Sequence, residues 1–396
     1  MAHLMSIEEP SPALRSGRAL WALGFRPFYL LASVFAALSI PLWALQFSGY
    51  LPHAYLAGPL WHAHEMLFGF ALAVIVGFLF TAGRNWTGRP TPTGPLLMAL
   101  AALWLIARVL VLTPYATAAA VANVGFPAAA AVALGVPFVQ ARNRRNYFFV
   151  ALLGLMAVAA LCFHLAHLGK AALPAWQGIR VALDVVLFIL VVMGGRVIPM
   201  FTNNGVPGAQ AAKKPWLEKT ALGCVLAVLA LDAMGVQGSV LALVTLLACV
   251  AHASRWTLWQ PWKTLGVPLV WVLHLAYLWI PVHLLLRALG EWGWVAPTLA
   301  THALTVGAIG GLVIGMMTRT ARGHTGRPLR ADRYETACYG FILLAAAVRV
   351  FLPWLAPTQT VHAMLVSACL WSAGFGIYAI RYWPILSRPR VDGRPG

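Results

Sequence analysis

The chain has 396 residues, of which 61% are hydrophobic and only 10% are charged, and its formal net charge is +18. A soluble domain has roughly 25% charged residues and about 45–50% apolar ones, so a water-soluble globule of this composition would expose far too much apolar surface. The composition therefore excludes a soluble globule, a disordered chain and a disulfide scaffold. It also argues against a soluble nucleic-acid binder, despite the positive charge.

Apolar runs of about 20 residues span a bilayer as helices, and the chain contains about twelve of them. In chain order they cover residues 27–47, 61–83, 94–112, 115–139, 146–168, 176–201, 219–235, 239–258, 268–288, 297–318, 334–355 and 359–384. The fourth run is a weaker candidate because it contains Pro127 and Pro137, and the seventh because it is short. The expected fold is an all-α polytopic membrane bundle.

The basic residues predict the orientation of this bundle, because Lys and Arg of short loops favour the cytoplasmic side. They fall in the N-terminal tail, after every second predicted helix and at the end of the chain, whereas the opposite loops hold Lys170 and almost nothing else. We therefore expect a cytoplasmic tail over residues 1–19, a twelve-helix domain over residues 20–384 and a cytoplasmic tail over residues 385–396. Residues 1–19 have no apolar core, so no cleavable signal peptide is expected.

The loops contain no second domain and no recognisable nucleotide motif. The longest, about 203–218 and 319–333, are short and hold neither a Walker A sequence nor a dinucleotide fingerprint. The positive charge is spread over separate short segments, which indicates topology and attraction to anionic lipid rather than to nucleic acid. No internal repeat is apparent at the residue level. Any function is expected within the membrane or at its edge.

Ionisable side chains inside membrane spans are costly and indicate functional sites. With the N-terminus inside, seven histidines from five predicted helices fall in the outer layer: His62, His64, His164, His167, His283, His302 and His362. Imidazole is the commonest metal ligand and suits copper and iron. Facing helices of a bundle build metal and haem sites in this way. The layer therefore predicts a metal or haem site, although a single interfacial histidine is more often only solvated.

Helical spacing separates these candidates, because a helix turns about 100° per residue. His164 and His167 share a face, whereas His62 and His64 point in opposite directions unless the helix is irregular there, which Pro59 makes plausible. Glu65 could orient an imidazole or relay protons. The alternative is a charge favoured at a helix start.

The other charged residues and histidines of the predicted spans allow more than one interpretation. His274 and His283 are nine residues apart and should not share a metal, and His274 is expected in the inner half, near Arg196. Arg196, Arg108 and Arg349 are each candidates for a haem propionate, with interfacial anchoring as the alternative. Arg180 and Asp184 are four residues apart, which predicts an ion pair within one helix.

Several segments together resemble one family of bacterial inner-membrane proteins. They are Leu23–Phe28, Trp61–Phe70 (which begins Trp-His-Ala-His-Glu-Met), Gly194–Pro199, His302–Gly307 and Met317–Arg319 running into Gly323–Arg327. With this pattern the chain resembles the NnrS family over about residues 20–384.

The resemblance implies a twelve-helix protein that contains haem b and copper and is linked to denitrification and nitric oxide resistance. It ranks the candidates within the family-like segments above His164, His167, His283 and His362. These candidates are His62, His64, Glu65, His274, His302, Arg319 and His324, with a loop residue in a tight turn as the alternative for His324. We expect His62, His64 and His302 to form one metal site, with His164, His167 and His283 as further ligands. We expect His274 to bind haem and Glu65 to supply protons.

The expected function is reductive conversion of nitric oxide to nitrous oxide, with electrons from an unidentified quinol or cytochrome. The alternatives are a haem-based nitric oxide sensor without turnover and, less favoured, a twelve-helix transporter.

Overall fold

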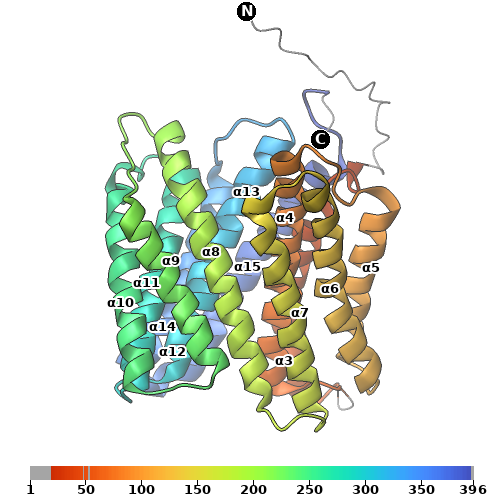
Figure 1. The fold of residues 1–396 in the computed structure, drawn as a ribbon, viewed down its shortest axis with the longest axis vertical. Helices are drawn as coiled ribbons and strands as arrows, with labels where there is room; N and C mark the ends of the chain where they lie inside the picture. The colour runs from red at the N-terminus through yellow and green to blue at the C-terminus, as the bar shows by residue number, and fades with distance from the viewer. Residues whose placement is uncertain (1–18, 48, 52–53, 394–396) are drawn as a thin grey trace, which may run out of the picture.

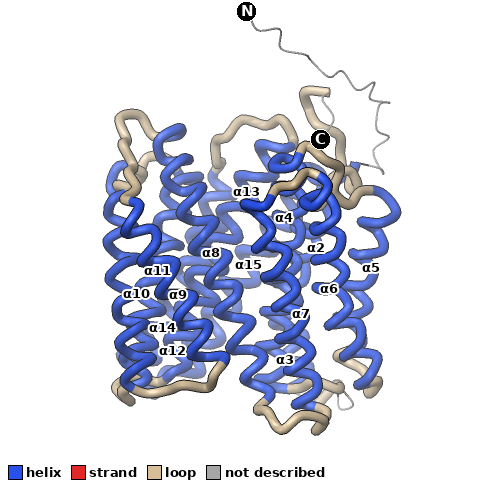
Figure 2. Tube along the Cα trace, in the orientation of Figure 1, coloured by secondary structure: helices blue, strands red, loops and turns tan. Residues whose placement is uncertain are grey.

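The protein is described by a computed structural model that covers residues 19–47, 49–51 and 54–393, and within these residues every regular element is helical (Figure 2). The long α-helices are α2 (Phe25–Phe47), α4 (Leu72–Thr87), α5 (Gly94–Leu110), α6 (Ala116–Gln140), α7 (Tyr147–His167), α8 (Ala175–Gly205), α9 (Pro215–Ala233), α10 (Ser239–Leu258), α11 (Pro268–Glu291), α13 (Gly311–His324), α14 (Arg333–Leu355) and α15 (Thr360–Ser387). Two short helices, α3 (Gly58–His64) and α12 (Pro297–His302), continue into α4 and α13 through the π-helices η1 (Glu65–Ala71) and η4 (Ala303–Gly310).

All twelve predicted apolar runs are helices in the structure. Among the described residues, ten helical segments are long and apolar enough to cross a membrane, and Gly94–Leu110 is a shorter apolar helix. The weaker fourth candidate is one continuous helix, α6, that contains both Pro127 and Pro137. The short seventh candidate, α9, begins earlier than expected, at Pro215. Residues 1–18 of the expected N-terminal tail, with Arg15 and Arg18, lie outside the described residues.

Local sequence chemistry sets several helix starts. Proline occupies the first turn of α3, α5, α9, α11 and α12, where its missing N–H costs no hydrogen bond. The start of α14 is a capping box in which the Asp332 carboxylate accepts from Tyr334 and Glu335, and the Glu335 carboxylate accepts from the Asp332 N–H.

The long helices lie side by side along one axis and form a bundle (Figure 1). The chain closes on itself because α15 packs against both α14 and α2. Arg26 at the start of α2 donates to the backbone carbonyls of Leu386 and Arg388, 2.9 and 2.8 Å away, at the end of α15. The first and last described segments therefore lie at the same end of the bundle, as the predicted even number of spans requires.

Many apolar side chains on the outer surface of the bundle are exposed. They include Val109, Val121, Val132, Leu243, Val361 and Ile380, from α5, α6, α10 and α15. A surface so apolar around a bundle of this kind is suited to lipid rather than to water. The chain is therefore a multi-pass membrane protein.

The two π-helices reveal an internal repeat that was not recognised from the sequence alone. Residues 59–90 and 297–328 align without gaps at a spacing of 238 residues. The matched identities are Pro59 with Pro297, His64 with His302, Gly69 with Gly307, Gly77 with Gly315, Arg84 with Arg322, and Thr87–Pro90 with Thr325–Pro328. The expectation of no internal repeat was therefore wrong.

Packing supports the repeat independently of the sequence. A Cβ on Gly77 would lie 2.8 Å from Phe28 of α2, and a Cβ on Gly315 would lie 2.8 Å from Leu273 of α11. Each glycine thus lets its helix approach the preceding long helix of its own repeat. The two spans also run in the same direction, because an even number of spans separates their starts. The repeat is therefore parallel rather than inverted.

Candidate functional site

Two imidazoles face each other at the end of the bundle where α3 begins and α7 ends. Nε2 of His64 lies 3.2 Å from Nε2 of His164, and both side chains are fully buried. Phe163 and Phe68 pack against the His64 ring. The pair therefore places two ring nitrogens in contact within an apolar surrounding. Both histidines belong to the predicted outer layer, and the structure brings their Nε2 atoms into direct contact.

Each imidazole of this pair is held through its other nitrogen. Nδ1 of His64 lies 2.8 Å from Glu65 Oε1, and Nδ1 of His164 lies 3.1 Å from the Tyr55 hydroxyl. If the His64 Nδ1–H donates to the carboxylate, the His64 Nε2 carries a free lone pair. A carboxylate behind a histidine in this way fixes its tautomer and raises its basicity as a ligand.

Glu65 is fully buried and is the centre of a charged network. Arg108 of α5 forms an ion pair with Glu65 Oε1, and its other terminal nitrogen donates to the side-chain oxygen of Asn123 on α6. Glu65 Oε2 is buried without a hydrogen-bond partner. This ion pair balances the buried charge of Arg108. The sequence did not reveal it because Glu65 is 43 residues away. The ion pair commits Arg108 to Glu65, whereas the sequence suggested a haem propionate.

The π-helix η1 makes room for this network. Gly69 lies within it, and a Cβ there would be 2.7 Å from Nη1 of Arg108. The Trp104 indole N–H donates to the Gly69 carbonyl, 3.0 Å away. A π-turn breaks the regular i−4 pattern of hydrogen bonds and often marks a functional site. Glycine is therefore needed at position 69 because the Arg108 side chain packs directly against the backbone there.

Tyr55 and His167 close the outer side of the site. His167 Nε2 lies 3.3 Å from the Tyr55 backbone carbonyl, and its ring stacks on Phe163. Burial raises the pKa of Tyr55, in the loop before α3, to about 12. Its hydroxyl therefore remains protonated at neutral pH, and its oxygen can accept a hydrogen bond from the His164 Nδ1–H, which leaves a lone pair on His164 Nε2. His167 shares a face with His164 as predicted, but it bonds to backbone.

His62 points away from His64, as the helical spacing predicts. Its ring stacks on Trp43 with centroids 4.6 Å apart, and its Nδ1 is buried without a partner. His302 and Arg349 lie close enough to His62 for their charges to interact. His302 Nδ1 is 2.7 Å from the Thr298 carbonyl within its own helix.

The expected shared metal site of His62, His64 and His302 is not assembled. Among the residues that the structure describes, no three His, Cys, Asp or Glu side chains come together in a way that could hold a metal ion. The physical reason is the helix period: His62 and His64 lie in the regular part of α3, because the irregular π segment begins only at Glu65. The imidazole that directly contacts His64 through a ring nitrogen is instead that of His164.

The two histidines of α11 each keep one free ring nitrogen. Nδ1 of His283 lies 2.8 Å from the Ala300 carbonyl, and its Nε2 is buried without a partner. Nε2 of His274 lies 2.8 Å from the Thr202 hydroxyl, and its Nδ1 is buried without a partner. The two rings belong to α11 but to separate environments, as their nine-residue spacing predicts.

The charged residues of α8 have other partners than those expected. Asp184 pairs with Arg287 of α11 at 3.4 Å, and Arg180 pairs with Asp232 of α9 at 3.8 Å. Arg287 also binds Asp232. The predicted ion pair between Arg180 and Asp184 is therefore replaced by a cluster that connects three helices.

Arg196 faces α7 rather than His274. Its Nη1 donates to the side-chain oxygen of Asn146, 2.9 Å away, and its guanidinium lies over the rings of Trp86 and Phe149. The adjacent Gly195 serves a different contact, because a Cβ there would lie 1.5 Å from Nη2 of Arg255. Arg255 in turn binds both carboxylate oxygens of Glu218, at 2.9 and 2.7 Å.

The family model described as "NnrS protein" matches residues 19–390, which is nearly the whole chain. The chain belongs to the NnrS family. No curated protein matches it. Membership in the NnrS family suggests a haem-containing membrane protein related to nitric oxide.

Sequence reasoning missed four residues around the NnrS site and its neighbouring charge cluster: Tyr55, Asn123, Asp232 and Arg287. A signal existed for two of them, because Asp232 and Arg287 are charged residues within predicted spans. Tyr55 and Asn123 are uncharged, and no spacing along the chain connects them with the residues they contact.

Proposed function

We propose that this NnrS protein lies in the bacterial inner membrane, holds haem b and copper, and reduces nitric oxide to nitrous oxide. The observation that carries the proposal is the buried pair His64–His164, with Glu65 and Tyr55 behind it. The balanced reaction combines two nitric oxide molecules, two electrons and two protons into nitrous oxide and water. A quinol or a cytochrome is the proposed source of the electrons.

The donor set suits copper bound by two imidazoles. Imidazole is a common copper ligand, and the two Nε2 atoms lie 3.2 Å apart. Donation from both Nδ1–H groups, to Glu65 and to Tyr55, would leave both Nε2 lone pairs free for one copper ion. We assign this position to copper, with His64 and His164 as ligands, in place of the expected set of His62, His64 and His302. We propose that His62 and His302 are not copper ligands, so that replacing either residue should change the copper content only weakly.

The proposed haem ligands are the two histidines of α11, each of which keeps a free buried nitrogen. His274 remains the first candidate, and His283 is the second because its Nδ1 bonds to backbone in the manner of metal-binding histidines. Arg349 lies near His62 and His302 and remains the candidate for a propionate. Bound haem and copper would supply the nitric oxide ligation and the electron transfer.

The residues of the chain supply orientation, exclusion of water and a proton. Glu65 holds the His64 ring, and Arg108 and Asn123 hold Glu65. Burial of the pair and the network keeps water from the reacting position. Glu65 Oε2 has no partner and is the atom available to pass a proton.

The test is the chemistry of the purified protein. Absorption spectra and metal analysis should give a Soret band together with copper. With a reductant, a nitric oxide electrode should record the consumption of many molecules per chain, with nitrous oxide as the product. Consumption that stops at one nitric oxide per chain would replace this proposal with a sensor. A protein without haem would contradict both.

A further inference from the structure

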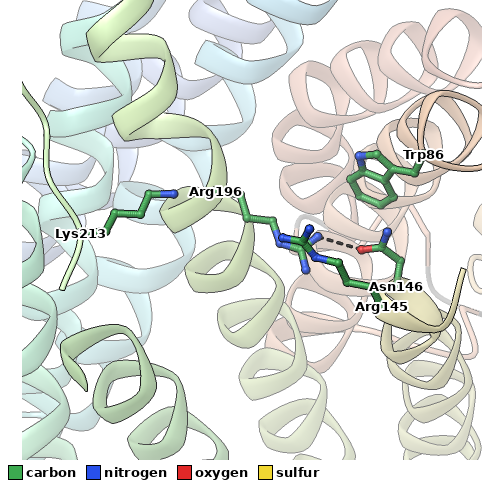
Figure 3. A pocket seen from close by; sticks show the side chains of 5 residues that line it. All are labelled: Trp86, Arg145, Asn146, Arg196 and Lys213. Atoms are coloured by element: carbon green, nitrogen blue, oxygen red, sulfur yellow. Dashed lines mark hydrogen bonds between the residues drawn. The ribbon is translucent and has the colours of Figure 1, made fainter. Parts of the chain in front are cut away.

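A basic pocket lies at the opposite end of the bundle from the imidazole pair. It has a volume of about 270 Å³ and is lined by Trp86, Arg145, Asn146, Arg196 and Lys213 (Figure 3). These residues come from the end of α4, the 3₁₀ turn before α7, the inner half of α8 and the loop before α9. Three of the five are cations, and none is an acid.

The central cation of this pocket is held in place by neutral groups. Arg196 is fixed by Asn146 at 2.9 Å and by the ring of Trp86, which itself stacks on Phe149 with centroids 5.4 Å apart. In Figure 3 the Arg196 guanidinium extends to Asn146 and Arg145, whereas the Lys213 ammonium lies on the other side of Arg196, near the start of its side chain. Arg145 and Lys213 each interact electrostatically with Arg196.

This arrangement leaves like charges close together without a balancing carboxylate. The nearest acid with an influence on Lys213 is Glu218, and both of its oxygens already bind Arg255. Like charges at short range repel each other, and Arg196 is half-buried, which weakens the screening by water. An anion between them would relieve it.

We infer that this pocket binds a phosphate group. Guanidinium groups bind phosphate through two parallel hydrogen bonds, and the Lys213 ammonium adds a point charge. Basic pockets between membrane helices at the cytoplasmic surface are suited to anionic lipid headgroups. The phosphate therefore comes from an anionic phospholipid of the inner leaflet or from a soluble phosphate compound, and the two sources share one chemistry.

The loops offer matched controls. Arg144 and Lys214 are exposed neighbours of Arg145 and Lys213, and neither lines the pocket. Replacing a control residue removes the same charge from the same loop. A loss caused only by net charge or by membrane orientation would therefore be equal in both variants of a pair.

The experiment uses the purified full-length protein in mixed micelles. Dioleoylphosphatidylglycerol and dioleoylphosphatidylcholine are titrated and bound lipid is counted by native mass spectrometry, and glycerol 3-phosphate is titrated by calorimetry. We expect saturable binding of one phosphatidylglycerol or one glycerol 3-phosphate per chain. Lys213→Gln, Arg145→Gln and Arg196→Gln should weaken it about tenfold or more, the scale of a lost hydrogen bond to a charged group. Lys214→Gln and Arg144→Gln should stay within about twofold.

The outcome also identifies the source of the phosphate. Binding of phosphatidylglycerol that glycerol 3-phosphate does not displace identifies a lipid, whereas binding of glycerol 3-phosphate alone identifies a soluble compound. No saturable binding of either probe would overturn the inference. So would equal losses in the pocket variants and their controls. Lys213 and Arg145 are exposed loop residues, so their variants keep the test valid if Arg196→Gln does not fold.

Discussion

At the residue scale, the pair of Glu65 and Arg108 decides how the outer site is held. Both side chains are buried, Glu65 completely, and Arg108 has Glu65 as its ion-pair partner. Removing one charge of a buried pair strands the other and costs about 3–5 kcal/mol, whereas replacing both by apolar groups is often neutral. The functional and structural roles of Glu65 can therefore be separated by mutation.

Glu65→Gln should keep haem and copper and lower nitric oxide turnover by roughly 10²-fold, the usual scale for a positioned acid. It should also lower the thermal unfolding temperature, because Arg108 loses its counter-charge. The double variant Glu65→Gln with Arg108→Met should recover the unfolding temperature but not the turnover. Recovery of turnover in the double variant would mean that Glu65 acts only through Arg108.

His64→Ala and His164→Ala should each remove copper, since each takes away one of two opposed ring nitrogens. His362→Ala is the matched control because His362 is an exposed histidine of the same predicted outer layer. Metal content is measured by mass spectrometry of the purified proteins, with the haem spectrum as a check of folding. Full copper in both pair variants would exclude the pair as the copper site.

How much of this site could be predicted follows from sequence distance. His64 and Glu65 are adjacent and were predicted together, and the opposite directions of His62 and His64 follow from the helix period. The pairing of His64 with His164 is a contact over 100 residues, and that of Glu65 with Arg108 spans 43. Depth in the membrane placed these residues in one layer, but it does not fix which helices are neighbours.

At the element scale, α8 shows why this chain has a small residue next to Arg196. Gly195 gives Arg255 and Glu218 the space to pair against the backbone of α8, while Arg196 turns towards α7. The sequence indicated an important segment here through Gly194–Pro199. It could not indicate the reason, because Arg255 comes from α10.

Gly195→Ala should destabilise the protein by about 1–3 kcal/mol from overpacking alone, and by more if the ion pair breaks. A Cβ there would lie 1.5 Å from Arg255 Nη2. Gly223→Ala in α9 is the control, because no atom lies within 4 Å of its added Cβ and alanine favours a helix interior by about 0.5–1 kcal/mol. Thermal unfolding in detergent measures both. A Gly195→Ala protein as stable as the control would show that Arg255 moves aside without cost.

At the scale of the whole molecule, composition and periodicity were sufficient for the architecture. All twelve apolar runs are helices, since hydropathy is a local property that each segment carries by itself. The closure of α15 onto α2 and the parallel repeat were not predicted, because both depend on which faces meet. A repeat with few identities becomes visible only once its π-helices are aligned.

The orientation of the bundle can be tested with single cysteines in a variant whose five native cysteines are replaced. Lys170→Cys lies in a loop with almost no other basic residue, and Arg144→Cys lies in a basic loop. An impermeant maleimide should label Lys170→Cys in intact spheroplasts and Arg144→Cys only after permeabilisation. The reverse pattern would place both termini outside.

The π-helices also record an order of events in the history of this chain. A π-turn amounts to one residue inserted into an α-helix, and η1 and η4 occupy equivalent places in the two repeats. Two separate insertions at the same register would be a coincidence, whereas one insertion followed by duplication of the segment accounts for both. We infer that the widened turn is older than the duplication. The two copies differ where the first has Glu65 and the second has Ala303, so after the duplication one copy carries a carboxylate at this turn and the other does not.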